Sequence, residues 1–251
     1  MSPNLLILGG TLEASELSRV VAQAGIKAVL SYAGRVKRPK AQLIPLRVGG
    51  FGGVSGLAQY IRARKITHVI DATHPFAAQI SHHAIAACQQ TATRLLALTR
   101  PPWEAKPEDR WRHAVDIAAA VTALSGPAQR IMLAIGRLHL DAFEACPQHH
   151  YLLRLIEAPS VTPPLPDHHM VISRGPFQVA DDAALLSRHR IDLVVAKNSG
   201  GKGAVAKIYA ARRLGVPVLM IDRPVLPPRE EVGSVTAVLA WLDHAETDLG
   251  G

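Results

Sequence analysis

The sequence predicts an α/β fold whose strands are mainly parallel. Short apolar segments alternate along the chain with longer segments in which apolar residues recur every three or four positions. The first pattern is typical of buried strands and the second of amphipathic helices, and their alternation favours parallel sheets covered by helices. With 251 residues, 48% of them hydrophobic, the chain is long enough for one large or two smaller domains.

Nine segments have the length and composition of strands. They lie near residues 4–8, 27–31, 67–71, 94–99, 129–135, 150–156, 170–174, 191–196 and 217–221. Between the first two, the spacing i, i+3, i+4, i+7 of a buried helix face is formed by Leu17, Val20, Val21 and Ala24. Similar helical patterns occupy about 54–64, 76–90, 115–124, 178–188, 203–214 and 232–243.

Proline-rich segments divide this series of elements. Three prolines lie between positions 101 and 107, where they would end any helix or strand and suit a linker. We therefore expect two domains, which cover residues 1–101 and 102–251. A second proline-rich segment, 158–166, is predicted to be either a flexible flap or an ordinary surface loop.

The composition excludes several classes of partner. A formal net charge of +8 and a pI near 9.9 favour anionic partners. However, no block of Lys and Arg occurs and only 4% of residues are aromatic, so we expect no nucleic acid. No apolar run is long enough to span a membrane, so we expect no membrane partner. An acidic small molecule is therefore the expected ligand.

Cysteine and histidine usage narrows the chemistry further. Cys88 and Cys146 lie far apart in apolar helical patterns, so we predict two buried thiols and a cytoplasmic location. The histidine pairs lack the spacing of zinc ligands, so we expect no metal. The sequence also lacks a G-x-S-x-G motif, so no acyl-transfer nucleophile is indicated.

The segment NLLILGGTLEA near the N-terminus is the most informative part of the chain. A predicted strand leads into two glycines and a threonine, and a helix begins directly after them. Bare backbone at the glycines and the free N–H groups of a helix N-terminus form a phosphate-binding site. The spacing G-x-G-x-x-G of the dinucleotide fingerprint is missing, so a glycine-capped turn without a ligand is the alternative. The predicted cofactor-binding residues here are Gly9, Gly10, Thr11, Leu12 and Glu13.

The end of the second predicted strand indicates which dinucleotide is bound. NAD-binding folds usually place an acid there to bind the ribose hydroxyls, but this chain has Ser31, Gly34 and Arg35 and no acid. A guanidinium binds phosphate oxygens through charge-assisted hydrogen bonds. We therefore predict NADP(H), with Ser31 and Arg35 at the 2′-phosphate and Gly34 in the same loop. The alternative is that Arg35 is a solvated loop charge.

Cations follow most of the later predicted strands. Ligands of open α/β sheets collect at the carboxyl ends of strands, and five of six such ends carry a cation, among them Arg100, Arg137, Arg174, Lys197 and Arg223. This pattern favours a substrate with several carboxylates, although Arg100 and Arg223 could instead cap helix or strand ends.

The segment after Lys197 is the most specific of these strand ends. It continues with Asn198, Ser199, Gly200 and Gly201 before a helical pattern begins. Such a glycine-rich turn between a strand and a helix is expected to bind an anion through its N–H groups.

A proton donor is indicated after the third predicted strand, in the segment DATHPFA. Pro75 suits a first helical turn, which places Thr73 or His74 near its cap. His74 would then lie at the mouth of the sheet, where it could donate a proton near neutral pH. A purely structural cap is the alternative for this histidine.

Four segments together resemble the precorrin-6A reductase family of cobalamin (vitamin B12) biosynthesis. They are ILGGTLEA, DATHPFA, RPPW at 100–103 and KNSGG at 197–201, and the similarity extends in the same order beyond residue 220. It implies two Rossmann-like domains with the active site in a cleft between them. It also implies an oxidoreductase that transfers hydride from NADPH to a carbon–carbon double bond of the tetrapyrrole precorrin-6A, giving precorrin-6B. A related branch acts on a cobalt-containing substrate, and Arg35 favours the NADPH branch.

Roles for individual residues follow from the motifs and this resemblance together. The first domain would bind NADPH, with Thr73 near the nicotinamide. His74 is the expected catalytic acid, and water or the substrate's own acids are the alternative proton donors. The second domain would bind the carboxylated tetrapyrrole. The expected substrate-binding residues are Arg100, Trp103, Arg137, Arg174, Lys197, Asn198, Ser199 and Gly200.

Two other functions remain open at this point. One is an NADP-linked reductase of another polyanionic metabolite, and the other is a non-catalytic NADP-sensing module. A sensor would need no cations at the strand ends of the second half, so these cations favour an enzyme. The pathway also suggests transient contact with neighbouring pathway enzymes.

Overall fold

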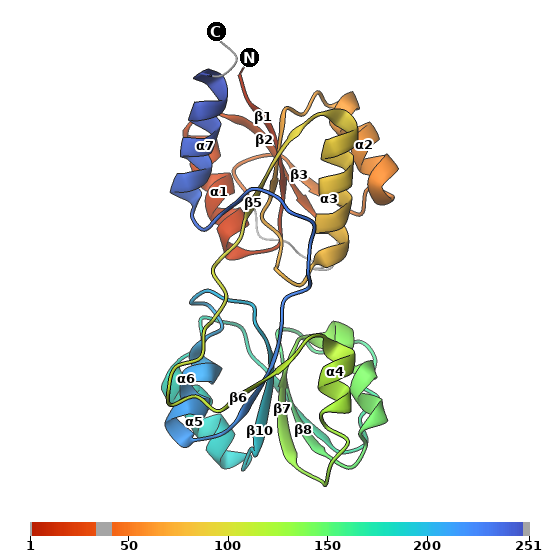
Figure 1. The fold of residues 1–251 in the computed structure, drawn as a ribbon, viewed down its shortest axis with the longest axis vertical. Coiled ribbons are helices and arrows are strands. Elements are labelled where there is room, and N and C mark those ends of the chain that lie inside the picture. The colour runs from red at the N-terminus through yellow and green to blue at the C-terminus, as the bar shows by residue number, and fades with distance from the viewer. Residues whose placement is uncertain (1, 34–41, 248–251) are drawn as a thin grey trace. The chain divides into compact units, whose positions relative to one another are not determined.

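The chain forms two compact units in the computed structural model, which describes residues 2–33 and 42–247. Unit 1 comprises Met1–Arg100 and Val225–Gly251, and unit 2 comprises Pro101–Pro224. Each unit is a sheet with helices on both faces (Figure 1). The predicted α/β class is confirmed.

Unit 1 contains a six-stranded sheet in the order β12-β5-β4-β1-β2-β3. Every neighbouring pair in it is parallel. Its elements are β1 (Asn4–Leu8), α1 (Leu12–Gln23), β2 (Lys27–Tyr32), β3 (Leu46–Val48), α2 (Gly53–Ala63), β4 (His68–Asp71), α3 (Ala78–Thr91), β5 (Arg94–Leu98), β12 (Glu231–Val232) and α7 (Val235–Thr247).

Strand β1 lies at the centre of this unit and contributes to both of its hydrophobic cores. Successive side chains of a strand point to opposite faces of the sheet. Leu5 and Ile7 therefore pack in the core that includes residues of α1 and α7, whereas Leu6 and Leu8 pack in the core that includes residues of α2 and α3. Burial on both faces explains why this strand is apolar at every position from Leu5 to Leu8 rather than at alternate ones.

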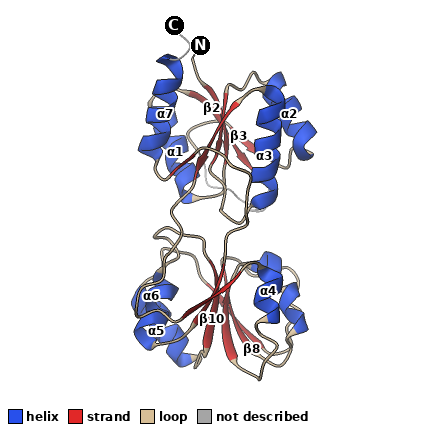
Figure 2. Ribbon diagram, viewed as in Figure 1, coloured by secondary structure: helices blue, strands red, loops and turns tan. Residues whose placement is uncertain are grey.

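Unit 2 repeats this architecture with the sheet order β6-β11-β10-β7-β8-β9, again parallel throughout. Its helices also lie on both faces of the sheet (Figure 2). Its elements are β6 (Trp111–Ala114), α4 (Ile117–Thr122), β7 (Arg130–Ala134), the 3-10 helices η1 (Arg137–His139) and η2 (Asp141–Ala145), β8 (His150–Leu155), β9 (His168–Ile172), α5 (Val179–Arg188), β10 (Leu193–Lys197), α6 (Ala206–Leu214) and β11 (Val218–Ile221).

The expected extent of the second domain, 102–251, is wrong at its C-terminal end. Residues from Val225 onward belong to unit 1, because β12 pairs with β5 and Trp241 of α7 packs in the core of that unit. The chain thus leaves unit 1 after Arg100 and returns to it after Pro224. Linker composition marks such a crossing, but it does not reveal which sheet the chain joins afterwards.

Short strands account for most other differences from the expected elements. The predictions from sequence did not include β3, β6 and β12. These strands have three, four and two residues, which is too few for a clear periodic pattern. The strand expected at 170–174 lies two positions earlier, at His168–Ile172. In the described part of the chain, no helix is long and apolar enough to cross a membrane.

His68 makes the stability of unit 1 depend on pH. Its ring is buried on β4, packs edge-on against Trp241 with the ring centroids 5.3 Å apart, and leaves Nε2 without a hydrogen-bond partner. Burial, and to a lesser extent the charge of Arg94, lowers the pKa of the His68 imidazole. The unfolded chain therefore binds this proton more readily than the folded one does.

We expect stability to fall as the pH drops below about 6.5, the ordinary pKa of histidine. This contribution is fully present above that pH and is lost below it, as protonation favours the unfolded chain. Urea unfolding at several pH values should give a shallower acid dependence for His68→Leu than for the wild type. The control His82→Leu, at an exposed position of α3, should retain the wild-type dependence. Equal acid dependence in all three proteins would contradict this role of His68.

Candidate functional site

The glycine turn, residues 9–11, connects β1 to α1 at the point where the strand order of unit 1 reverses. The chain passes from β1 to β2 on one side and from β4 to β5 on the other, so the carboxyl ends of β1 and β4 flank a switch point, where ligands of open α/β sheets bind. Thr11 connects the two ends. Its hydroxyl donates to the Ala72 carbonyl at 2.8 Å and accepts from the Ala14 N–H at 3.1 Å, which caps α1.

The two glycines serve different purposes. A Cβ atom on Gly9 would lie 2.6 Å from Leu30 Cδ1 and 3.1 Å from Tyr32 Cε1, so only glycine lets the turn pack this closely on β2. Gly10 has a φ of 124°, and a Cβ placed there would meet no atom within 4 Å. It therefore presents backbone to open space, as a phosphate-binding turn requires.

Leu12 and Glu13, both predicted to bind the cofactor, differ in their contacts. The side chain of Leu12 is exposed. Glu13 lies 3.3 Å from Arg100 Nη1, so the expected substrate residue Arg100 neutralises a carboxylate beside the glycine turn. This places Arg100 in unit 1, whereas the other expected substrate cations belong to unit 2.

Ser31 lies at the carboxyl end of β2, next to the glycine turn. It is buried, and its carbonyl accepts a hydrogen bond of 2.9 Å from the Gly9 N–H. Gly34 and Arg35, which we expected beside it, lie outside the described residues. The sequence reading missed Arg47, which pairs with Ser31 across β2 and β3, because it did not recognise β3 as a strand.

Asp71, at the end of β4, holds the switch-point loop, residues 72–77. Its carboxylate accepts four hydrogen bonds, from the Thr73 N–H at 3.1 Å, the Thr73 hydroxyl at 2.6 Å, the Ser81 hydroxyl at 2.6 Å and Arg229 Nη1 at 2.5 Å. Thr73 is thus fixed at the switch point. No sequence signal connected Asp71 with Arg229, which lies 158 positions away.

His74 follows Thr73 and has a defined ring orientation. Its Nδ1 atom accepts a hydrogen bond of 3.2 Å from the Phe76 N–H, so in this arrangement Nδ1 carries no proton. The ring can then donate through Nε2–H, but to act as an acid it must also be protonated at Nδ1, which breaks the bond to Phe76.

Unit 2 has its own switch point, between β7 and β10. The chain passes from β7 to β8 on one side and from β10 to β11 on the other. Gly136, with a φ of 75°, and Arg137 follow β7, and Lys197 is the last residue of β10. Arg174 lies beyond the end of β9 and donates to Glu157 at 2.5 Å. Three of the expected substrate cations are therefore brought to the same edge of this sheet.

A third arginine near this edge was not expected. Arg154, on β8, is buried and forms an ion pair with Asp182, and its guanidinium carbon lies 4.1 Å from the centre of the Phe177 ring. Because its charge is matched by a buried carboxylate, Arg154 contributes to packing rather than adding a free cation.

Trp103 and Asn198, both expected to bind substrate, hold each other in place. The Asn198 side chain accepts from the Trp103 N–H at 2.8 Å and donates to the Trp103 carbonyl at 2.9 Å. Trp103 Nε1 also donates to the Gly201 carbonyl at 2.8 Å. These bonds fix the glycine-rich turn, residues 198–201, whose Gly200 and Gly201 have φ values of 66° and 72°. The Asn198 amide is thus occupied in shaping the turn.

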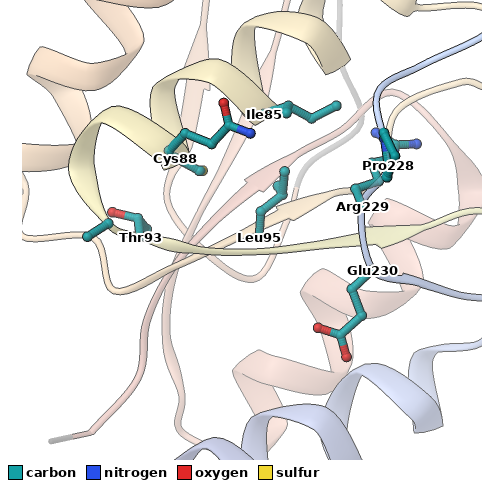
Figure 3. A pocket seen from close by; sticks show the side chains of 9 residues that line it. Ile85, Cys88, Thr93, Leu95, Pro228, Arg229 and Glu230 are labelled. Carbon is teal, nitrogen blue, oxygen red and sulfur yellow. The ribbon is translucent and has the colours of Figure 1, made fainter.

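A cavity of about 320 Å³ in unit 1 lies beside the start of β5 rather than at the carboxyl ends of the strands. It is enclosed by α3, the start of β5 and residues 228–230 (Figure 3). Cys88 lines it, and burial, together with the charge of Asp71, raises the pKa of the Cys88 thiol to about 12. The thiol is therefore neutral at physiological pH and unreactive. The geometry at the switch points indicates the functional site better than the volume of this cavity, since ligands bind at the carboxyl ends of the strands.

Comparisons with known proteins identify the family of this chain. Residues 4–243 match the family described as "Precorrin-6x reductase CbiJ/CobK". The precorrin-6A reductase of Rhodobacter capsulatus is 54% identical over 247 residues, which cover 98% of each chain. That of Mycobacterium tuberculosis is 41% identical and covers 95% of this chain and 96% of the relative. The cobalt-precorrin-6A reductase of Salmonella typhimurium is 25% identical and covers 88% of each chain.

A solved structure gives the same result at the level of the fold. The structure titled "CobK precorrin-6A reductase" superposes with a TM-score of 0.91, at 54% identity and over 96% of each chain. The relatives therefore match this chain over nearly its whole length and in both units. This chain belongs to the precorrin-6x reductase family CbiJ/CobK.

Proposed function

We propose that this protein uses NADPH to reduce a carbon–carbon double bond of precorrin-6A, giving precorrin-6B in cobalamin biosynthesis. The observation that carries the proposal is the glycine turn at the switch point of unit 1, in a chain of this reductase family. When bound, NADPH supplies the hydride, and the protein contributes binding, orientation and the exclusion of water.

The residues of unit 1 suit a dinucleotide phosphate. Gly10 presents open backbone, Thr11 caps α1, and the N–H groups of that helix point toward the same place. No acid occupies the end of β2, where Ser31, Tyr32 and Ala33 lie, so the ribose-binding carboxylate of NAD-specific folds is missing. Thr73 follows Ala72, whose carbonyl accepts from the Thr11 hydroxyl, and remains the residue predicted near the nicotinamide. Gly34 and Arg35 remain predicted members of this site.

The residues of unit 2 suit a flat macrocycle with carboxylate arms. Arg137, Arg174 and Lys197 supply positive charge at one edge of the sheet. Leu138, just after β7, and Ile156, just after β8, are 59% and 64% exposed. Exposed apolar side chains beside cations would contact the ring face while the cations bind the rim.

The remaining substrate residues have supporting roles in this proposal. The backbone of Ser199 and Gly200 would bind a carboxylate, and Trp103 with Asn198 would keep that turn in shape. Arg100 would act from unit 1, next to the cofactor. The cytoplasmic location and transient contacts with neighbouring pathway enzymes stay predictions from composition and from the resemblance.

Anaerobic incubation of the protein with NADPH and precorrin-6A tests this function. We expect NADPH absorbance to fall together with the long-wavelength absorbance of the macrocycle, because reduction shortens its conjugation. Parallel incubations with NADH and with cobalt-precorrin-6A compare the other cofactor and the other branch of the family. NADPH oxidation without a change in the macrocycle, or no reaction with precorrin-6A, would contradict the proposal.

The role of His74 as the proton donor gives a separate prediction. If this imidazole protonates the carbon next to the one that receives hydride, His74→Ala should lower kcat by roughly 10²- to 10⁴-fold and leave the dissociation constant of NADPH unchanged. Single-turnover measurements across pH check this, because the fall in rate at high pH, where a general acid has lost its proton, should be seen in the wild type and be absent in His74→Ala. Near wild-type turnover in His74→Ala would assign the protonation to water or to the substrate's own acids.

A further inference from the structure

We propose that Arg47 determines the preference for NADPH over NADH by forming the 2′-phosphate site together with Ser31. This inference rests on the proposed use of NADPH and adds a residue that neither the sequence pattern nor the family match indicated. It assigns to β3, a strand of three residues, a part in cofactor selection.

Arg47 lies at the carboxyl edge of the sheet, two strands from the glycine turn. Ser31 and Arg47 are direct partners in the pairing of β2 with β3, and the Ser31 carbonyl accepts from the Gly9 N–H. The chain of contacts from the phosphate-binding turn through Ser31 to Arg47 is therefore continuous. In a dinucleotide-binding sheet, the end of β2 is where the adenosine ribose is bound.

The guanidinium of Arg47 is held in one orientation. Nη1 donates to the Ser31 hydroxyl at 3.2 Å and to the Gly49 carbonyl, and Nη2 donates to the Gly50 carbonyl at 2.7 Å. Its central carbon lies 3.8 Å from the centre of the Phe51 ring. A guanidinium that is already fixed loses little conformational entropy when it binds a phosphate.

The positive charge of Arg47 is not matched by a carboxylate. Among residues 2–33 and 42–247, no ion pair involves Arg47, and the oxygen atoms that it contacts belong to a hydroxyl and two carbonyls. This differs from Arg100, Arg154 and Arg229, each of which has an acidic partner. A half-buried cation without a counter-charge favours an anion at this end of β2.

The bond between Arg47 and Ser31 also orients the serine hydroxyl. Because Ser31 Oγ accepts from Arg47, its own proton is available to a further acceptor. The oxygens of a 2′-phosphate are strong acceptors for this proton and attract the guanidinium as well. A ribose hydroxyl gains only the first of these interactions, which is the physical basis of the proposed preference.

The alternative is that Arg47 only fastens residues 49–51 to the sheet. In that case its loss would loosen the edge of unit 1 and weaken the binding of both dinucleotides alike. Comparing the binding of NADPH with that of NADH therefore distinguishes a role of Arg47 in cofactor preference from a purely structural role. A measurement with NADPH alone could not do this.

The test uses isothermal titration of the full-length protein with NADPH and with NADH. We expect Arg47→Met to weaken NADPH binding roughly 10- to 100-fold, the range for a hydrogen bond to a charged group, and to leave NADH binding unchanged. Arg47→Lys, which keeps the charge but not the planar fork, should lie between the wild type and Arg47→Met. Arg62→Met is the matched control, because it removes a guanidinium of α2 that contacts the Gln90 carbonyl. It should leave both constants at their wild-type values.

Three results would overturn the role of Arg47. They are an equal loss for both cofactors, an unchanged ratio of the two constants in both Arg47 variants, or a loss of preference in Arg35→Met alone. If Arg47→Met does not fold, as judged by its circular dichroism spectrum, Arg47→Lys decides between these outcomes. A wild-type protein that binds NADH as tightly as NADPH would instead refute the proposed cofactor and, with it, this inference.

Discussion

The Asp71→Ala variant is expected to lose about 3 kcal/mol of unfolding free energy and to bind its cofactor more weakly. Asp71 is 2% exposed, and the Arg229 side chain is 9% exposed. Among the residues that the structure describes, removing the carboxylate leaves a buried guanidinium with only its bond to the exposed Glu231. It also leaves the hydroxyls of Thr73 and Ser81 without the acceptor that they now share. The switch-point loop should therefore loosen as unit 1 becomes less stable.

Urea unfolding and NADPH titration measure the two effects of this substitution separately. Asp167→Ala is the comparison, because it removes an exposed carboxylate that pairs with His150 and should change stability by less than about 1 kcal/mol. Adding Arg229→Met to Asp71→Ala should restore part of the stability, since no buried charge then lacks a partner. If Asp71→Ala were no more destabilising than Asp167→Ala, the buried pair would not hold the loop.

The Gly200→Ala variant should distort the glycine-rich turn of unit 2, residues 198–201. A Cβ atom on Gly200 would lie 2.2 Å from the Pro101 carbonyl oxygen and 2.5 Å from Arg223 Nη2. The carbonyl belongs to the backbone and cannot rotate away, so the turn or the segment at Pro101 must move. We expect a loss of about 1–3 kcal/mol of stability and weaker binding of the carboxylated substrate.

Gly215 offers a matched control for this prediction. It has the same φ of 66°, but the nearest atom to an added Cβ is Arg110 Cζ at 4.0 Å. Gly215→Ala therefore carries the backbone strain of a left-handed residue without the clash. The difference between the two variants, in thermal unfolding and in the KM of the substrate, isolates the effect of the contact with Pro101. Equal effects in both would show that the turn tolerates a side chain.

Local patterns were enough to predict most of the fold. The strands β1, β10 and β11 are buried on both faces, and such strands are visible in a sequence because nearly every position is apolar. The glycine turn was found for the same reason, since its strand, glycines and helix are adjacent in the chain. Prediction failed for β12, whose assignment depends on pairing with β5 across a whole intervening unit.

The candidate site was predicted less completely than the fold. Thr73 and Ser31 were named from their positions after strands, but what holds them is distant in sequence. Asp71, which holds Thr73, accepts a hydrogen bond from Arg229, and the Ser31 hydroxyl accepts one from Arg47. Asn198 was named as a substrate contact from its place in a glycine-rich turn, and in the structure its amide bonds to the backbone of Trp103. Side chains that shape a site cannot be distinguished by residue type from those that touch a ligand.

Isotope transfer tests the central claim, that this protein moves hydride from NADPH to precorrin-6A, most directly. The measurement is the mass of the macrocyclic product after anaerobic turnover with NADPH that carries deuterium at both C4 positions. Using both positions makes the result independent of the face from which the hydride leaves. We predict a product one mass unit heavier than the product formed with unlabelled NADPH. A product without deuterium, or precorrin-6A recovered unchanged, would contradict the account.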